Sequence, residues 1–222
     1  MYDVVRGPLV WGAFGVFGLG LISQVIQFFV LTKRKDPAIL PPTFRPEGIS
    51  KKGIMDRVTE WFLSLKRTVW YSHPLVMVMT AIFHLCLIVT PLFVLGHNIL
   101  LDESWGVGFW SLSEGATDAL TFIVFICTAF FLIRRIAVAR VRAITSAEDY
   151  LILLIAVAPF VTGYMAYHQW LDYRTVILLH ILAGEVMLAA LPFTKLGHML
   201  FFFLYRLMIG SEHSFSQGTR SW

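Results

Sequence analysis

The chain has 222 residues, of which 57% are hydrophobic and 14% are charged, and its formal net charge is +4. Soluble domains carry about 25% charged residues, so this composition excludes an ordinary soluble protein and indicates a multi-pass membrane protein. No basic stretch outside the apolar segments is interleaved with stacking aromatic residues, which argues against nucleic-acid binding.

Five apolar stretches are long enough to cross a hydrocarbon core about 30 Å thick. The first lacks an A-x-A-like cleavage site, so we expect it to remain as a span rather than to be removed as a signal peptide. We predict an all-α integral membrane protein that forms one domain over residues 1–222, a bundle of five transmembrane helices with one amphipathic interfacial helix. The predicted spans lie at about residues 9–31, 74–96, 116–133, 150–167 and 175–209.

The connection between the first two spans reads in two parts. Residues 36–49 hold four prolines and should be extended. Residues 53–70 place apolar side chains on one stripe and basic side chains elsewhere, which predicts an amphipathic helix. This helix either lies in the inner headgroup plane or docks a cytoplasmic partner subunit, and the two roles are compatible.

Lys and Arg are concentrated in the first and third connections. The connection at 97–115 carries none, and the last connection carries only Arg174. Because loops rich in Lys and Arg stay in the cytoplasm, the N-terminus is predicted to lie outside and the C-terminus in the cytoplasm.

Four histidines lie on two of the predicted spans at helical spacing. His73 and His84 are 11 residues apart, and His180 and His198 are 18 apart. At about 100° per residue these steps return to about 20° and about 0°, so each pair shares a helix face. Burying an unpaired imidazole in hydrocarbon is costly. Two facing pairs therefore predict two bis-histidine irons stacked across the membrane, as in a dihaem cytochrome b.

Antiparallel helices pair His84 with His180 and His73 with His198. On straight helices the axial rises within the two spans are about 16 Å and about 27 Å. Helix tilt, kinks expected at Pro74 and Pro192, and tilted haem planes could absorb this mismatch of roughly 10 Å; otherwise one of the four assignments is wrong. A single histidine could instead form an interhelical hydrogen bond or reach the interface, and His73 has the weakest case as a ligand because it abuts the interface.

Three further polar residues have two interpretations each. His97 and His168 end predicted spans on the outer side, where they are either solvated or lie near the outer haem or a quinone. Glu185 lies about 140° around the fifth span from His180. It either belongs to a proton path or bonds to a neighbouring helix or subunit.

Cys86 and Cys127 are expected to be small apolar fillers.

The two histidine-bearing stretches resemble the γ (cytochrome b) subunit of respiratory nitrate reductase. They read HPLVMVMTAIFHLCLIVTP from His73 and HILAGEVMLAALPFTKLGH from His180. The N-terminal run GPLVWGAFGVF from Gly7 is similar to cytochrome b subunits of the transmembrane redox complexes of sulfate-reducing bacteria, of the high-molecular-weight or tetrahaem cytochrome c type. The chain differs from the nitrate reductase family at Phe83, where that family has glycine.

The resemblance implies two haem b groups in a bacterial cytoplasmic (inner) membrane. It implies His73, His84, His180 and His198 as axial ligands. The chain would carry electrons between a periplasmic multihaem cytochrome c and cytoplasmic iron–sulfur partners. It would be one subunit of a larger oxidoreductase, and this subunit would not be catalytic alone. Without a C-x-x-C-H motif, any haem is held non-covalently.

Two alternatives stay open. Within the same class, the chain could itself oxidise or reduce menaquinone near His84, His97 and His168. In a different class, it could be a haem-free transporter or a membrane anchor scaffold for soluble subunits. A transporter is expected to show repeats or broken helices with polar groups at mid-depth.

Overall fold

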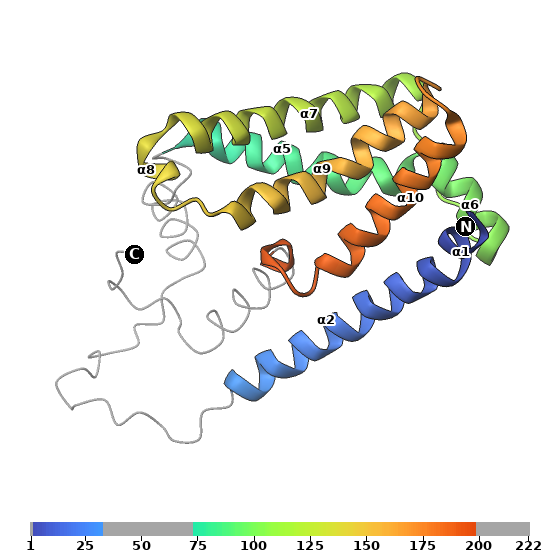
Figure 1. The fold of residues 1–222 in the computed structure, drawn as a ribbon, viewed down its shortest axis with the longest axis horizontal. Coiled ribbons are helices and arrows are strands. Elements are labelled where there is room, and N and C mark those ends of the chain that lie inside the picture. The colour runs from blue at the N-terminus through green and yellow to red at the C-terminus, as the bar shows by residue number, and fades with distance from the viewer. Residues whose placement is uncertain (1, 33–72, 199–222) are drawn as a thin grey trace, which may run out of the picture. The chain divides into compact units, whose positions relative to one another are not determined.

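The computed structural model describes residues 2–32 and 73–198, which fold as helices and turns with no strand among them. The predicted all-α architecture with five helices long and apolar enough to span a membrane is confirmed. The predicted interfacial helix at 53–70 lies outside the described residues. The five helices, drawn in Figure 1, are Tyr2–Val30, Pro74–Phe93, Glu114–Ala137, Ala147–Tyr167 and Tyr173–Ala190.

The helices gather into two compact units, each described by itself. One unit comprises Met1–Thr32 with Thr145–Trp222, and the other comprises Lys33–Ile144. The first is therefore built from both ends of the sequence, and the second from one continuous stretch. Organisation as a single domain over 1–222 stays a prediction.

The first unit begins with α1 (Tyr2–Val4), the π-helical turn η1 (Val5–Leu9) and α2 (Val10–Thr32). Pro8 lies inside the π turn, where a wider turn accommodates a ring that would clash with the preceding turn of an α-helix. The best-buried residues of this long helix recur every seven or eight positions and form one stripe. They are Val5, Ala13, Gly20 and Phe28.

The last two spans of the first unit are α9 (Ala147–Tyr167) and α10 (Tyr173–Ala190). A short turn joins them, so they run antiparallel. Helix α10 packs against both α9 and α2, and it lies between them in Figure 1. Gly20 in the buried stripe of the first helix lies against Pro192 and Phe193, just after the end of α10.

The second unit is built around α5 (Pro74–Phe93) packed on α7 (Glu114–Ala137). Each helix buries one face, at spacings of three and four residues, as expected for paired helices. On α5 and α7 these buried residues are Phe83, Cys86, Thr90, Thr121, Val124 and Cys127. Both cysteines are free thiols, in keeping with the predicted filler role. The short helix α8 (Ala139–Arg142) follows α7.

A further helix, α6 (Leu95–Trp105), follows α5 after a break at Val94, whose ψ is 135°. The predicted span at 74–96 is therefore shorter than expected. Asn98 closes the break. Its amide nitrogen lies 3.3 and 3.4 Å from the carbonyl oxygens of Leu92 and Val94, and its Oδ1 accepts a 3.0 Å bond from the backbone of Phe109.

The largest departure from the sequence prediction is in the fifth span, which was expected to run from 175 to 209. Residues 199–209 of that span lie outside the described residues. Helix α10 instead ends at Ala190, a turn follows, and Lys195–Gly197 forms the 3₁₀ helix η3. Pro192 gives the physical reason. It has no N–H for the carbonyl four residues earlier, and its ring opposes continuation of the helix. The helix at the predicted third span, by contrast, is longer than expected, because α7 runs from Glu114 to Ala137 and the prediction was 116–133.

Candidate functional site

His84 lies half-buried within α5, and its ring orientation is defined by the backbone. Its Nδ1 is 2.7 Å from the carbonyl oxygen of Thr80. A carbonyl oxygen only accepts, so Nδ1 carries the proton and Nε2 carries the lone pair. Nε2 is therefore the atom of His84 that could ligate a metal.

His180 has the same arrangement on α10, but its partner belongs to the neighbouring helix. Its Nδ1 is 2.9 Å from the carbonyl oxygen of Pro159 on α9, and the Thr162 hydroxyl oxygen lies 3.4 Å from the same nitrogen. Thr162 also donates to the Ala158 carbonyl at 2.7 Å. This tautomer again leaves the lone pair on Nε2.

Gly163 allows the His180 ring to lie directly against α9. A Cβ at this position would lie 2.9 Å from Cε1 and 3.1 Å from Nδ1 of His180. Such contacts are too close for any larger residue without movement of the ring or the helix. Pro159, Thr162 and Gly163 were not predicted from the sequence.

His73 and His198 lie at the ends of helices and are exposed. His73 precedes α5 as its N-cap, with φ −141° and ψ 65°. His198 follows η3, and its Nδ1 bonds to the carbonyl oxygen of Lys195. The prediction that His180 and His198 share one face of a continuous helix is wrong, because α10 ends between them. The axial rise of about 27 Å, which assumed that helix, no longer applies.

The two histidines that were predicted to lie on the outer side are each held within their own unit. In the second unit, His97 Nδ1 lies 2.8 Å from the Pro91 carbonyl oxygen. In the first, His168 follows α9, and its ring centroid is 4.2 Å from that of Tyr164. Trp170 packs edge-on against Tyr164 at 5.3 Å. Whether His97 or His168 meets a haem or a quinone stays a prediction.

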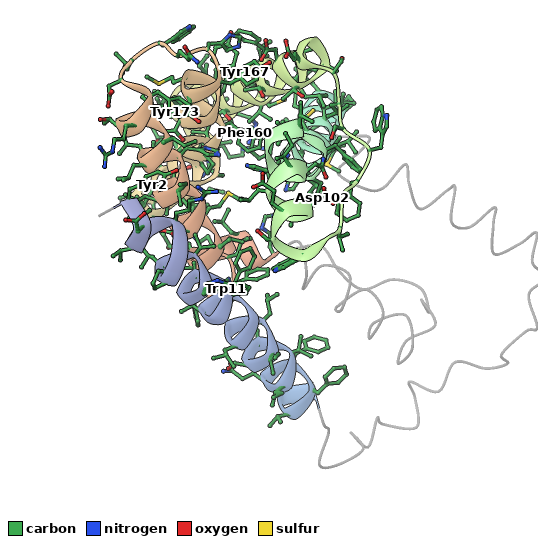
Figure 2. The ribbon with its side chains drawn as sticks, turned by 90° about the vertical axis from the view of Figure 1, so that its right-hand side faces the viewer. Tyr2, Trp11, Asp102, Phe160, Tyr167 and Tyr173 are labelled. Carbon is green, nitrogen blue, oxygen red and sulfur yellow. The ribbon has the colours of Figure 1, made fainter. Side chains whose placement is uncertain are left out.

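Aromatic side chains mark one end of the first unit. Tyr167 and Tyr173, where α9 ends and α10 begins, are 52% and 54% exposed. Tyr2 lies at the same end, where α1 begins (Figures 1 and 2). Exposed tyrosines at helix ends are typical of a membrane–water interface.

Glu185 is the buried acid of α10. It is 7% exposed, and neither of its carboxyl oxygens has a hydrogen-bond partner among the described residues. An unpaired buried polar group costs about 1–3 kcal/mol, so the position is unfavourable for packing alone. Its assignment to a proton path or to helix contacts stays open.

The turn after α10 is held from two sides within the first unit. On the α2 side, the Gln24 amide donates to the Pro192 carbonyl at 3.1 Å. On the α9 side, Lys195 Nζ lies 3.0 Å from Asp149 and 3.4 Å from Glu148. The hydrogen bond to Asp149 is the main cause that raises the pKa of Lys195.

An apolar groove of about 360 Å³ lies between α9 and α10. Small residues form part of its lining, and Thr162 is its polar member. Because Thr162 also contacts His180, the groove reaches the surroundings of that ring. Its lining residues include Leu154, Ala158, Thr162, Leu179, Ala183 and Val186.

No group of three or more His, Cys, Asp or Glu side chains suited to a bare metal ion occurs in the described part of the chain. A haem supplies the equatorial ligands of its own iron and takes only axial ones from the protein. Single histidines held by carbonyl bonds, as at His84 and His180, are therefore a fitting ligand type for it.

No protein-family description and no solved structure matches this chain. A protein of Nitratidesulfovibrio vulgaris (strain Hildenborough) is 34% identical to it over 219 residues, which cover 98% of this chain and 96% of that protein. With such an identity over nearly the full length of both sequences, the chain belongs to the same family as this Nitratidesulfovibrio protein.

Proposed function

We propose that the chain is a membrane cytochrome b subunit that carries electrons across a bacterial cytoplasmic membrane through two b haems. His84 and His180 ligate one iron, and His73 and His198 the other. The observation that carries the proposal is the matching state of His84 and His180. Each lies within an apolar helix of spanning length, with Nδ1 on a backbone carbonyl. Proteins commonly orient metal-ligating histidines through such a bond.

The depth of these two histidines in their own helices supports the assignment. His84 lies ten residues after Pro74 and nine before Phe93, or about 15 Å and 14 Å along α5. His180 lies seven residues after Tyr173 and ten before Ala190, or about 10 Å and 15 Å along α10. Each ring is thus well inside its span, where an iron would be shielded from water.

The second pair is supported by position at helix ends. His73 precedes α5, and His198 follows the turn after α10. In the predicted orientation both ends are cytoplasmic. Because α10 ends at Ala190, the axial rise of about 27 Å between His180 and His198, which assumed one straight helix, no longer argues against this pairing. The haem supplies the one-electron chemistry. The chain's histidines would ligate the irons, and the depth of His84 and His180 in their helices would keep water away from the iron that they hold.

We further propose that the soluble partners are a periplasmic multihaem cytochrome c and cytoplasmic iron–sulfur proteins. Two observations support this assignment. A relative that matches nearly the whole chain comes from a sulfate-reducing bacterium. The N-terminal run of this chain from Gly7 resembles cytochrome b subunits of such complexes. The predicted outer face also carries acidic residues, which attract basic cytochromes. They are Asp102, Glu103, Glu114, Asp118 and Asp172.

The test is a haem count per chain on the purified full-length protein by pyridine haemochrome. We expect two b haems in the wild type and one in each of His84→Ala, His180→Ala and His198→Ala. His97→Ala is the matched control, since its Nδ1 bonds to a carbonyl in the same way but it is not assigned as a ligand. It should keep both haems.

Each other outcome contradicts a stated part of the proposal. A colourless wild type would favour the transporter or scaffold alternative. One haem in the wild type would rule out two stacked irons. Loss of a haem in His97→Ala but not in His84→Ala would reassign the ligand on the second unit.

A further inference from the structure

We infer that the turn after α10 holds the His198 imidazole in a defined position. Gly20 and Gln24 of the first helix are then positioning residues for the haem that His198 ligates. This inference rests on the proposed function. It concerns α2, α9 and α10, which belong to one compact unit.

The turn itself is continuously hydrogen-bonded. The backbone N–H groups of Phe193 and Thr194 both donate to the Ala190 carbonyl, at 3.2 and 3.1 Å. The Thr194 hydroxyl donates to the same carbonyl at 2.8 Å and accepts a bond from the N–H of Leu196 at 3.3 Å. Gly197 N–H donates to the Thr194 carbonyl at 3.1 Å. These bonds define the path of the chain up to His198.

The first helix holds this turn by close packing. Pro192 is buried, and a Cβ at Gly20 would lie 2.6 Å from Pro192 Cγ and 2.9 Å from Phe193 Cζ. Only glycine lets α2 approach the proline ring so closely. Gln24, one helical turn later, donates its amide to the Pro192 carbonyl at 3.1 Å. An ordinary helix end would require neither contact.

The start of α9 holds the turn from its other side. Lys195 Nζ lies 3.0 Å from Asp149, which also accepts a 2.8 Å bond from the backbone of Ser146. The Lys195 carbonyl in turn binds Nδ1 of His198. Displacement of the turn would therefore move the imidazole that binds to it. Among the described residues, the chain of contacts runs from Gly20 and Gln24 through Pro192 to His198.

The test compares two variants with matched controls on the same helix, all in the full-length protein. Gly20→Ala is paired with Gly18→Ala, because a Cβ at Gly18 meets nothing within 4 Å. Gln24→Leu is paired with Gln27→Leu, because among the described residues the Gln27 amide bonds to Ser23 of its own helix and to no other helix. Each is also made in a His84→Ala background, which assigns the signals to one haem.

The first readout is the midpoint potential and the low-spin electron paramagnetic resonance signal of each haem. We expect Gly20→Ala and Gln24→Leu to shift the signals of the His198 haem and to leave those of the His84–His180 haem unchanged. Gly18→Ala and Gln27→Leu should match the wild type. Equal shifts of both haems would indicate general destabilisation and would overturn the positioning role.

The second readout does not depend on haem. Hydrogen exchange of the amides from Phe193 to Gly197 should be about tenfold faster in Gln24→Leu, as expected for loss of one hydrogen bond to a buried carbonyl. Unchanged exchange would overturn the support itself. Two haems with unchanged signals in both variants would remove only the positioning role, whereas a wild type without haem would remove the proposed function as well.

Discussion

At the scale of single residues, the surroundings of His180 show how a neighbouring helix selects one state of an imidazole. The ring meets a carbonyl at Pro159 and a position without a side chain at Gly163. The carbonyl selects the tautomer, and the glycine sets the distance of the ring from α9. Both features come from α9 and neither from the helix that carries the histidine.

We predict that Gly163→Ala displaces the His180 ring, because the added methyl would lie 2.9 Å from Cε1. Overpacking of this kind costs about 1–3 kcal/mol. A lower melting temperature and a loss or spectral shift of the His84–His180 haem are therefore expected. Gly184→Ala is the control, since nothing lies within 4 Å of its added Cβ. A Gly163→Ala protein with unaltered haem spectra would contradict the ring placement.

The apolar stretches predicted that His84 and His180 lie within spans, and the bounds of α5 and α10 confirm this. The partners of His180 could not be read from spacing along one helix, because they depend on which helix lies beside it. A signal was available, however. The turn between Tyr167 and Tyr173 is short, and an antiparallel hairpin with such a turn sets residues near 160 opposite His180.

At the scale of elements, the two ends of α10 differ in kind. Its N-terminus is capped by Asp172, which accepts bonds from the backbone and the hydroxyl of Thr175 at 2.9 and 2.7 Å. The hydroxyl bond, followed by the backbone bond, lowers the pKa of Asp172 from its ordinary value of 3.8. At its C-terminus the helix ends at Ala190, shortly before Pro192, and the turn that follows contacts α2 and α9.

This cap predicts a pH dependence. Because the pKa of Asp172 is lower in the folded state than in the unfolded state, its contribution to stability is present above about pH 3.8. That contribution is lost as the pH falls through the lowered folded value. Asp172→Ala should lower the melting temperature at neutral pH, whereas Asp172→Asn should keep the cap.

Thermal unfolding at neutral pH and at about pH 3 tests the sign. On acidification the wild type should lose stability relative to Asp172→Asn, whose amide does not titrate. A difference between the two proteins that stays constant with pH would show that the charge of Asp172 contributes nothing to the cap.

A kink was expected at Pro192, but the end of α10 was not, because helical phase was extended across the proline to His198. The residues from 175 onward are apolar enough to suggest one long span, and composition alone does not distinguish a helix from an apolar turn. The proline was a visible sign of a kink. What could not be foreseen is that Gly20 and Gln24 lie against it, since they are distant in sequence.

At the scale of the whole molecule, length and composition predicted the five helices of spanning length that the described residues contain, because a membrane requires long apolar segments. They could not predict the division into two units, one of which joins the two ends of the chain. That division depends on contacts between elements that no local pattern specifies.

The predicted orientation is testable by labelling single cysteines. In a background of Cys86→Ala and Cys127→Ala, which removes two buried thiols, Glu103→Cys should react with a membrane-impermeant maleimide in intact spheroplasts. Arg140→Cys should react only after permeabilisation, because its connection is rich in arginine. The reverse pattern would place the N-terminus in the cytoplasm.

The pairing of the first helix with the turn after the last has a consequence for biosynthesis. Chains are made from the N-terminus, so α2 enters the membrane long before Pro192 leaves the ribosome. Until then the Gln24 amide lacks its acceptor and the surface at Gly20 lies open to lipid. The second unit is continuous in sequence and can pack α5 on α7 during this interval. The first unit must therefore be the last to assemble, after the final span has been inserted.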